Sequence, residues 1–98
     1  MKAKLRRRST FANVWDALED TPALAANMTM RSDLLIALRQ RIGTWKVTQA
    51  QAARRLQVTQ PRLNDLLRGR IGKFSLDALV ELADRAGIHV RLRIDKAA

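Results

Sequence analysis

The feature that most constrains the fold is a pair of short helical segments separated by only two residues. Thr48 is placed to cap the first segment, which extends to Leu56, and Gln51 three residues later completes a capping box. The second segment, Thr59–Arg68, begins with its own threonine cap. Two connecting residues are too few for the helices to run antiparallel, so the pattern predicts that they cross sharply.

The residues at the predicted crossing suit close packing of two helices. Ala52 and Ala53 are small enough to let the helices approach each other. The apolar side chains expected to fill the corner are Val58, Leu63, Leu66 and Leu67. Pro61 falls at the second helical position, where the amide would have no acceptor within the helix. The proline therefore begins the second helix instead of breaking it.

The second helix of the pair has an outward face with side chains spaced by four residues: Gln60, Asn64 and Arg68. In the major groove of DNA, Gln and Asn can pair bidentately with adenine, and Arg can pair with guanine. Arg62 lies beside this row and is a fourth candidate for contacting bases. The same residue types also form the solvated side of ordinary amphipathic helices. The row alone therefore does not distinguish a base-contacting face from a solvated one.

The distribution of charge favours DNA as the partner. The chain has 19 Lys and Arg against 9 Asp and Glu, for a formal net charge of +10. The 28 residues 46–73 contain seven basic residues and one acid, Asp65, so they hold +6 of this charge. The residues expected to contact phosphates without regard to sequence are Arg54, Arg55, Arg70 and Lys73. Asp65 either accepts a hydrogen bond from cytosine or lowers non-specific affinity.

The remaining periodicity predicts an all-α fold of five or six helices. Outside the pair, helices are expected at about residues 10–18, 22–27, 29–42 and 75–86, with Gly43 and Gly87 ending the last two. The core face of the last helix would comprise Leu76, Leu79, Val80, Leu82, Ala83 and Ala86. Hydrophobic residues make up 47% of the chain and aromatic residues only 4%, a composition typical of helical proteins.

After Gly87 the hydrophobic period changes from that of a helix to the two-residue period of a strand. In the segment IHVRLRI, one face carries Ile88, Val90, Leu92 and Ile94. A lone strand leaves its backbone donors and acceptors unpaired. We therefore expect it to pair antiparallel with the same strand of a second copy, which predicts a homodimer.

The stretch TQAQAARRLQVTQPRLNDLLRG resembles the helix-turn-helix of the phage-repressor-like XRE family. The positions that match the family pattern are Gln49, Ala53, Leu56, Val58, Thr59 and Gln60, and the likeness continues through FSLDALVELADRAGI. The resemblance implies that Gln49 contacts a phosphate and that Gln60 contacts a base. The cap residue Thr59 is a further candidate for contacting a phosphate. Glycine is usual in the family where Gln57 stands. If Gln57 adopts a left-handed conformation, it costs about 1–2 kcal/mol.

Residues 11–94 as a whole resemble HigA-type antitoxins. This resemblance implies a protein that neutralises a RelE-like ribonuclease toxin by direct binding and represses its own operon through a palindromic operator. A solitary phage-type repressor without a toxin partner is the alternative. We expect an N-terminal segment, residues 1–28, followed by a DNA-binding and dimerisation domain, residues 29–98. The N-terminal stripe formed by Phe11, Val14, Trp15 and Leu18 either packs in the core or docks on the toxin.

The composition argues against catalysis and against a cofactor or metal. The chain has one His, no Cys and no Tyr, and it lacks a glycine-rich phosphate loop. Its apolar runs are too short to cross a bilayer, and the basic start is followed by no apolar signal segment. We therefore expect a cytoplasmic binding protein with no small-molecule substrate.

Overall fold

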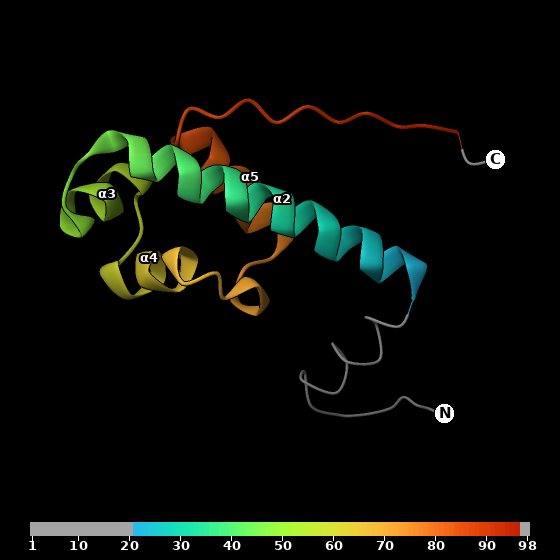
Figure 1. Cartoon of the computed structure of the whole chain (residues 1–98), viewed down its shortest axis with the longest axis horizontal. Helices are drawn as coiled ribbons and strands as arrows, with labels where there is room; N and C mark the ends of the chain where they lie inside the picture. The colour runs from blue at the N-terminus through green and yellow to red at the C-terminus, as the bar shows by residue number, and fades with distance from the viewer. Residues whose placement is uncertain (1–20, 97–98) are drawn as a thin grey trace. The chain divides into compact units, whose positions relative to one another are not determined.

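The computed structural model describes residues 21–96, in which all regular secondary structure is helical (Figure 1). The elements are α2 (Pro22–Trp45), α3 (Gln49–Leu56), α4 (Gln60–Leu67), the 3-10 turn η1 (Ile71–Lys73) and α5 (Leu76–Arg85). The chain divides into two compact units, residues 1–30 and 31–98. The helix expected at residues 10–18 lies outside the described residues.

The helix α2 begins as predicted but does not end as predicted. The hydroxyl of Thr21 accepts a hydrogen bond from the Leu24 amide at 3.1 Å, and Pro22 occupies the first helical position. The predicted break near residue 28 and the stop at Gly43 are wrong. The Thr29 hydroxyl donates to the Ala25 carbonyl at 3.0 Å, within a helix that continues without interruption.

The end of α2 is set by a lysine instead of a glycine. Gly43 remains helical, and the chain leaves the helix after Trp45. Lys46 then takes a left-handed conformation with φ of 54°. A glycine can adopt this conformation at no steric cost, but it is not forced to, so the position of Gly43 alone could not mark the helix end.

The core of the second unit is made by one face of each of its four helices. Figure 1 shows α3, α4 and α5 gathered beside the C-terminal part of α2. Each helix contributes at least one fully buried leucine, and α4 contributes two: Leu38, Leu56, Leu63, Leu66 and Leu79. Phe74, in the loop before α5, is also buried. Val80 was expected in this core, but it is 39% exposed, so that part of the prediction is wrong.

A buried arginine ties α2 to the loop before α5. Arg31 is only 1% exposed, and its Nη1 donates to the carbonyl of Phe74 at 3.0 Å. The same nitrogen lies 3.5 Å from the carbonyl of Ile71. Hydrogen bonds from a charged donor are stronger than those between neutral groups, so this contact fixes the loop that leads into α5. An arginine in an amphipathic helix gave no sequence signal of burial.

Two further arginines bind the carbonyl groups that helix ends leave without partners. Arg41 of α2 donates from Nε to Ala86 at 3.0 Å and from Nη2 to Gly87 at 3.3 Å, at the end of α5. Arg85 of α5 donates from Nη1 to Leu56, the last residue of α3, at 3.2 Å. Cations are favourable at helix C-termini, so these contacts stabilise the packing of α2, α3 and α5.

The predicted C-terminal strand is not found among the described residues. Residues 88–96 are extended but form no ladder of hydrogen bonds with any other residue between 21 and 96. Ile88 belongs to the domain itself, because its amide donates to the Ala83 carbonyl at 2.8 Å and its side chain packs against the core. Val90, Leu92 and Ile94 are 46%, 79% and 83% exposed. A strand needs a partner, and the described part of the chain offers none to this segment.

The connection between α3 and α4 is a Schellman turn built on a residue other than glycine. Gln57 has φ of 59° and ψ of 42°, in the left-handed region. The Val58 amide donates to the Ala53 carbonyl at 2.9 Å, and the Gln57 amide donates to the Arg54 carbonyl at 3.1 Å. Glycine occupies the corresponding positions after α4 and α5, Gly69 and Gly87. Gln57 therefore carries steric strain that glycine at this position would avoid.

We predict that Gln57→Gly stabilises the protein. Glycine removes the steric cost of the left-handed conformation, which is about 1–2 kcal/mol. This gain exceeds the free energy lost because glycine makes the unfolded chain more flexible, about 0.4–1 kcal/mol. The expected gain in the free energy of unfolding is roughly 0.5–1 kcal/mol, measured by urea denaturation at one protein concentration. The matched control is Gln40→Gly, at an exposed position within α2, which should lose about 1 kcal/mol. Equal losses in both variants would contradict the prediction.

Candidate nucleic-acid interface

The two helices of the pair begin where the sequence predicts. The Thr48 hydroxyl accepts from the Gln51 amide at 3.2 Å, and the Gln51 side-chain oxygen accepts from the Thr48 amide at 3.0 Å, which completes the capping box. The Thr59 hydroxyl accepts from the Arg62 amide at 3.3 Å, and Pro61 is the second residue of α4. These caps set where each helix starts and therefore which side chains share a face.

The predicted base-contacting row lies on the side of α4 away from the core. Burial of Leu63 and Leu66 against the other helices leaves Gln60 and Arg68 exposed, while Asn64 is half-buried. Within residues 21–96, the side chains of this row make no hydrogen bond or ion pair. The row is therefore available to bind the edges of bases.

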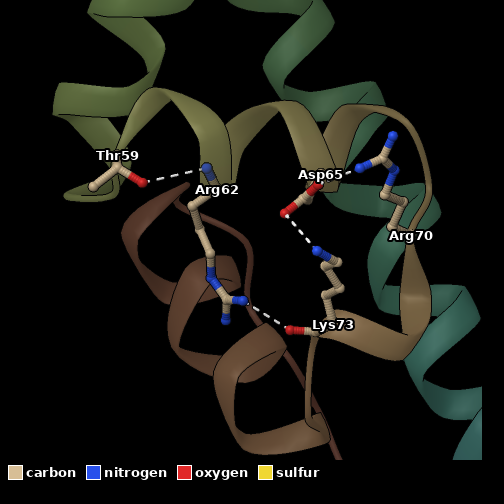
Figure 2. A network of polar contacts seen from close by, with 5 residues as sticks. All are labelled: Thr59, Arg62, Asp65, Arg70 and Lys73. Carbon is tan, nitrogen blue, oxygen red and sulfur yellow. Dashed lines mark hydrogen bonds and ion pairs between the residues drawn. The ribbon is translucent and has the colours of Figure 1, made fainter. Parts of the chain in front are cut away.

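Arg62, the fourth predicted base-contacting residue, is held against the protein. Its Nη1 donates to the carbonyl of Lys73 at 2.7 Å (Figure 2). Its guanidinium also stacks over the ring of Phe74, 4.1 Å from the centroid. These contacts join α4 to the loop before α5. For Arg62 to contact a base, its guanidinium would have to leave the aromatic ring.

Asp65 binds two of the predicted phosphate-contacting cations. Its Oδ1 lies 3.0 Å from Nη1 of Arg70, and its Oδ2 lies 3.8 Å from Nζ of Lys73. Figure 2 shows the carboxylate of Asp65 directed at both cations. These partners lie beyond the turn at Gly69, so helical periodicity could not reveal that they face Asp65.

The other predicted phosphate-contacting residues differ in how strongly the protein engages them. Gln49 stands at the start of α3 and Arg54 near its end, and both are exposed, with no side-chain hydrogen bond or ion pair in the described part of the chain. Arg55 stacks over the half-buried ring of Trp45, 4.1 Å from its centroid. The hydroxyl of Thr59 accepts the helix cap bond but can still donate.

The remaining predicted sites are the toxin-docking stripe and the dimer strand. The stripe Phe11, Val14, Trp15 and Leu18 lies outside the described residues. Of the predicted dimer strand, Ile88 packs on the core of its own chain, while Val90, Leu92 and Ile94 are exposed. Between residues 21 and 96, no group of three or more His, Cys, Asp or Glu could hold a metal, and no helix there could cross a membrane.

The sequence also matches a known protein family. Residues 17–95 match the model of a protein family described as a helix-turn-helix domain, which covers most of the chain. No curated protein matches the sequence. The match agrees with the capped pair α3 and α4 and with a DNA-binding regulator of the general type that the XRE resemblance implies.

Proposed function

This chain belongs to the helix-turn-helix domain family, and from that premise we propose that it is a repressor that inserts α4 into the major groove of a specific operator. The observation that carries the proposal is the row Gln60, Asn64 and Arg68, which α4 presents with no side-chain partner in the described part of the chain. The protein acts by binding alone, without catalysis or a cofactor.

The charge around α4 supports a DNA partner. Gln49 and Arg54 of α3 are exposed and can contact phosphates on one side of the groove. Arg55, Arg70 and Lys73 add positive charge, although each also contacts a group of the protein. These cations contribute affinity that depends on salt and not on sequence.

We expect Gln60→Ala to lose discrimination between DNA sequences. One bidentate pair contributes roughly 1–3 kcal/mol, so the preference for operator over random DNA should fall about 5- to 150-fold. The probes are a duplex selected from a random pool by the wild-type protein and a random-sequence duplex of the same length. Binding is measured by fluorescence anisotropy.

The matched control is Arg54→Ala, which removes an exposed cation that has no side-chain partner in the described residues. It should weaken binding to both duplexes about equally. It should also make the salt slope, the dependence of the logarithm of the binding constant on the logarithm of the salt concentration, shallower by about 0.9. Equal effects of the two variants on both duplexes would show that α4 is not the element that recognises bases.

A homodimer would place two copies of α4 in successive major grooves, about 34–36 Å apart, on a palindromic operator. The extended C-terminal segment supports this arrangement. Val90, Leu92 and Ile94 alternate along it and are exposed, and its backbone forms no ladder of hydrogen bonds within residues 21–96. Antiparallel pairing with a second copy would satisfy the backbone groups and cover the apolar face.

We predict that the wild-type protein sediments as a dimer at micromolar concentration. Leu92→Asp should shift it to a monomer, because a charge on the apolar face cannot be buried without a partner. His89→Asp introduces the same charge on the opposite face of the segment and should leave the dimer intact. A monomeric wild-type protein, or equal dissociation of both variants, would count against the pairing.

Neutralisation of a RelE-like ribonuclease toxin is the second part of the proposed function. It rests on the resemblance of residues 11–94 to HigA-type antitoxins. The apolar stripe Phe11, Val14, Trp15 and Leu18 would dock on the toxin as an amphipathic helix does in a groove. A solitary repressor of phage type would use this stripe for packing alone, so toxin binding through the stripe distinguishes the two functions.

The experiment uses the product of the adjacent reading frame as the candidate toxin. Co-expression with the wild-type protein should restore growth, and Trp15→Ala should lose at least tenfold in affinity for the toxin while keeping its melting temperature. Gln60→Ala serves as the matched control and should still restore growth. If the neighbour is not toxic or does not bind, the protein acts as a solitary repressor.

A further inference from the structure

The acid on α4 has both of its carboxylate oxygens occupied by cations of the same chain. Asp65 Oδ1 contacts Arg70 at 3.0 Å and Oδ2 contacts Lys73 at 3.8 Å. The Asp65 side chain is 17% exposed, whereas those of Arg70 and Lys73 are 46% and 58% exposed. The cations are thus open to solvent, and the acid lies behind them.

The loop that carries these cations is also held by other bonds. The Arg70 amide donates to the Asp65 carbonyl at 3.0 Å, and the Gly69 amide donates to the Leu66 carbonyl at 3.1 Å. The Arg62 guanidinium binds the Lys73 carbonyl at 2.7 Å (Figure 2). The backbone of the loop therefore does not depend on the carboxylate of Asp65, which leaves an electrostatic role for that group.

The arrangement also argues against direct contact between Asp65 and a base. An acceptor for cytosine needs an oxygen lone pair directed into the groove. Both oxygens of Asp65 instead point toward Arg70 and Lys73 in the loop after α4. A phosphate oxygen that approaches either cation must share it with a carboxylate already in place.

We propose that Asp65 is a specificity-determining residue that lowers affinity for DNA of any sequence by holding Arg70 and Lys73 in ion pairs. This inference rests on the proposed DNA-binding function. With these two cations partly neutralised, phosphate contacts alone give weak binding. The base contacts of α4 then account for a larger share of the affinity for the operator.

The decisive variant is Asp65→Asn, which keeps the shape of the side chain and removes its charge. At 0.1 M salt the affinity for a random-sequence duplex should rise about 5- to 10-fold, and the salt slope should steepen by about 1. The affinity for the duplex selected by the wild-type protein should rise less. The ratio of the two affinities should therefore fall.

Three controls separate this role from a general effect of charge. Glu81→Gln removes an acid of α5 that pairs with Arg85 at 3.8 Å, and it should change neither the ratio nor the slope appreciably. Asp65→Glu keeps the charge and should retain the wild-type ratio. In a background with both Arg70→Gln and Lys73→Gln, Asp65→Asn should have no further effect, because the cations it would release are absent.

The outcomes distinguish this inference from the proposed function. If the wild-type protein binds no duplex, the proposed function fails. If it binds and selects a sequence but Asp65→Asn behaves like Glu81→Gln, the inference is overturned while the function stands. A loss of affinity for the selected duplex alone would show that Asp65 contacts a base. An unchanged effect in the background without the two cations would also overturn the inference. Circular dichroism melting verifies that each variant is folded.

Discussion

The arrangement of α3 and α4 depends on one left-handed residue. Gln57 reverses the chain within two residues, and the hydrogen bonds to the carbonyls of Ala53 and Arg54 hold that reversal in place. The crossing buries Leu63 against the core, and the opposite side of α4 is thereby left to the row that begins with Gln60. A different backbone conformation at Gln57 would rotate or displace α4. The strain at this residue is therefore offset by the packing it permits.

The positive charge of the chain serves two purposes that composition cannot separate. One group of arginines donates to backbone carbonyls and stabilises the fold: Arg31, Arg41, Arg62 and Arg85. Other basic residues, such as Arg54 and Arg68, have no side-chain partner in residues 21–96 and remain available for phosphates or bases. The count of 19 Lys and Arg therefore overstates the number of cations that are free to contact a phosphate directly. Long-range attraction to DNA follows the summed charge of the protein, whereas direct phosphate contacts depend on the exposed cations without a partner.

The errors of prediction share a physical cause. A glycine permits a helix to end, but Gly43 stays helical, and the left-handed residue after the helix is Lys46, three residues later. Val80 fits the hydrophobic period of α5, yet no other part of the described chain covers it fully. The segment that begins near Ile88 has the alternation of a strand but finds no partner among the described residues. In each case the local pattern permits a structure that only a neighbouring segment can enforce.

The sequence by itself determined the caps at Thr48 and Thr59, the tolerance for Pro61 and the face of α4 that carries Gln60. Each of these follows from hydrogen bonds and periodicity within a few residues, which any folded context preserves. Tertiary structure alone decided that Asp65 pairs with Lys73, that Arg62 lies on Phe74 and that Arg31 is buried. These contacts join residues that become neighbours only after the helices have packed, so their partners are set by the fold and not by local spacing.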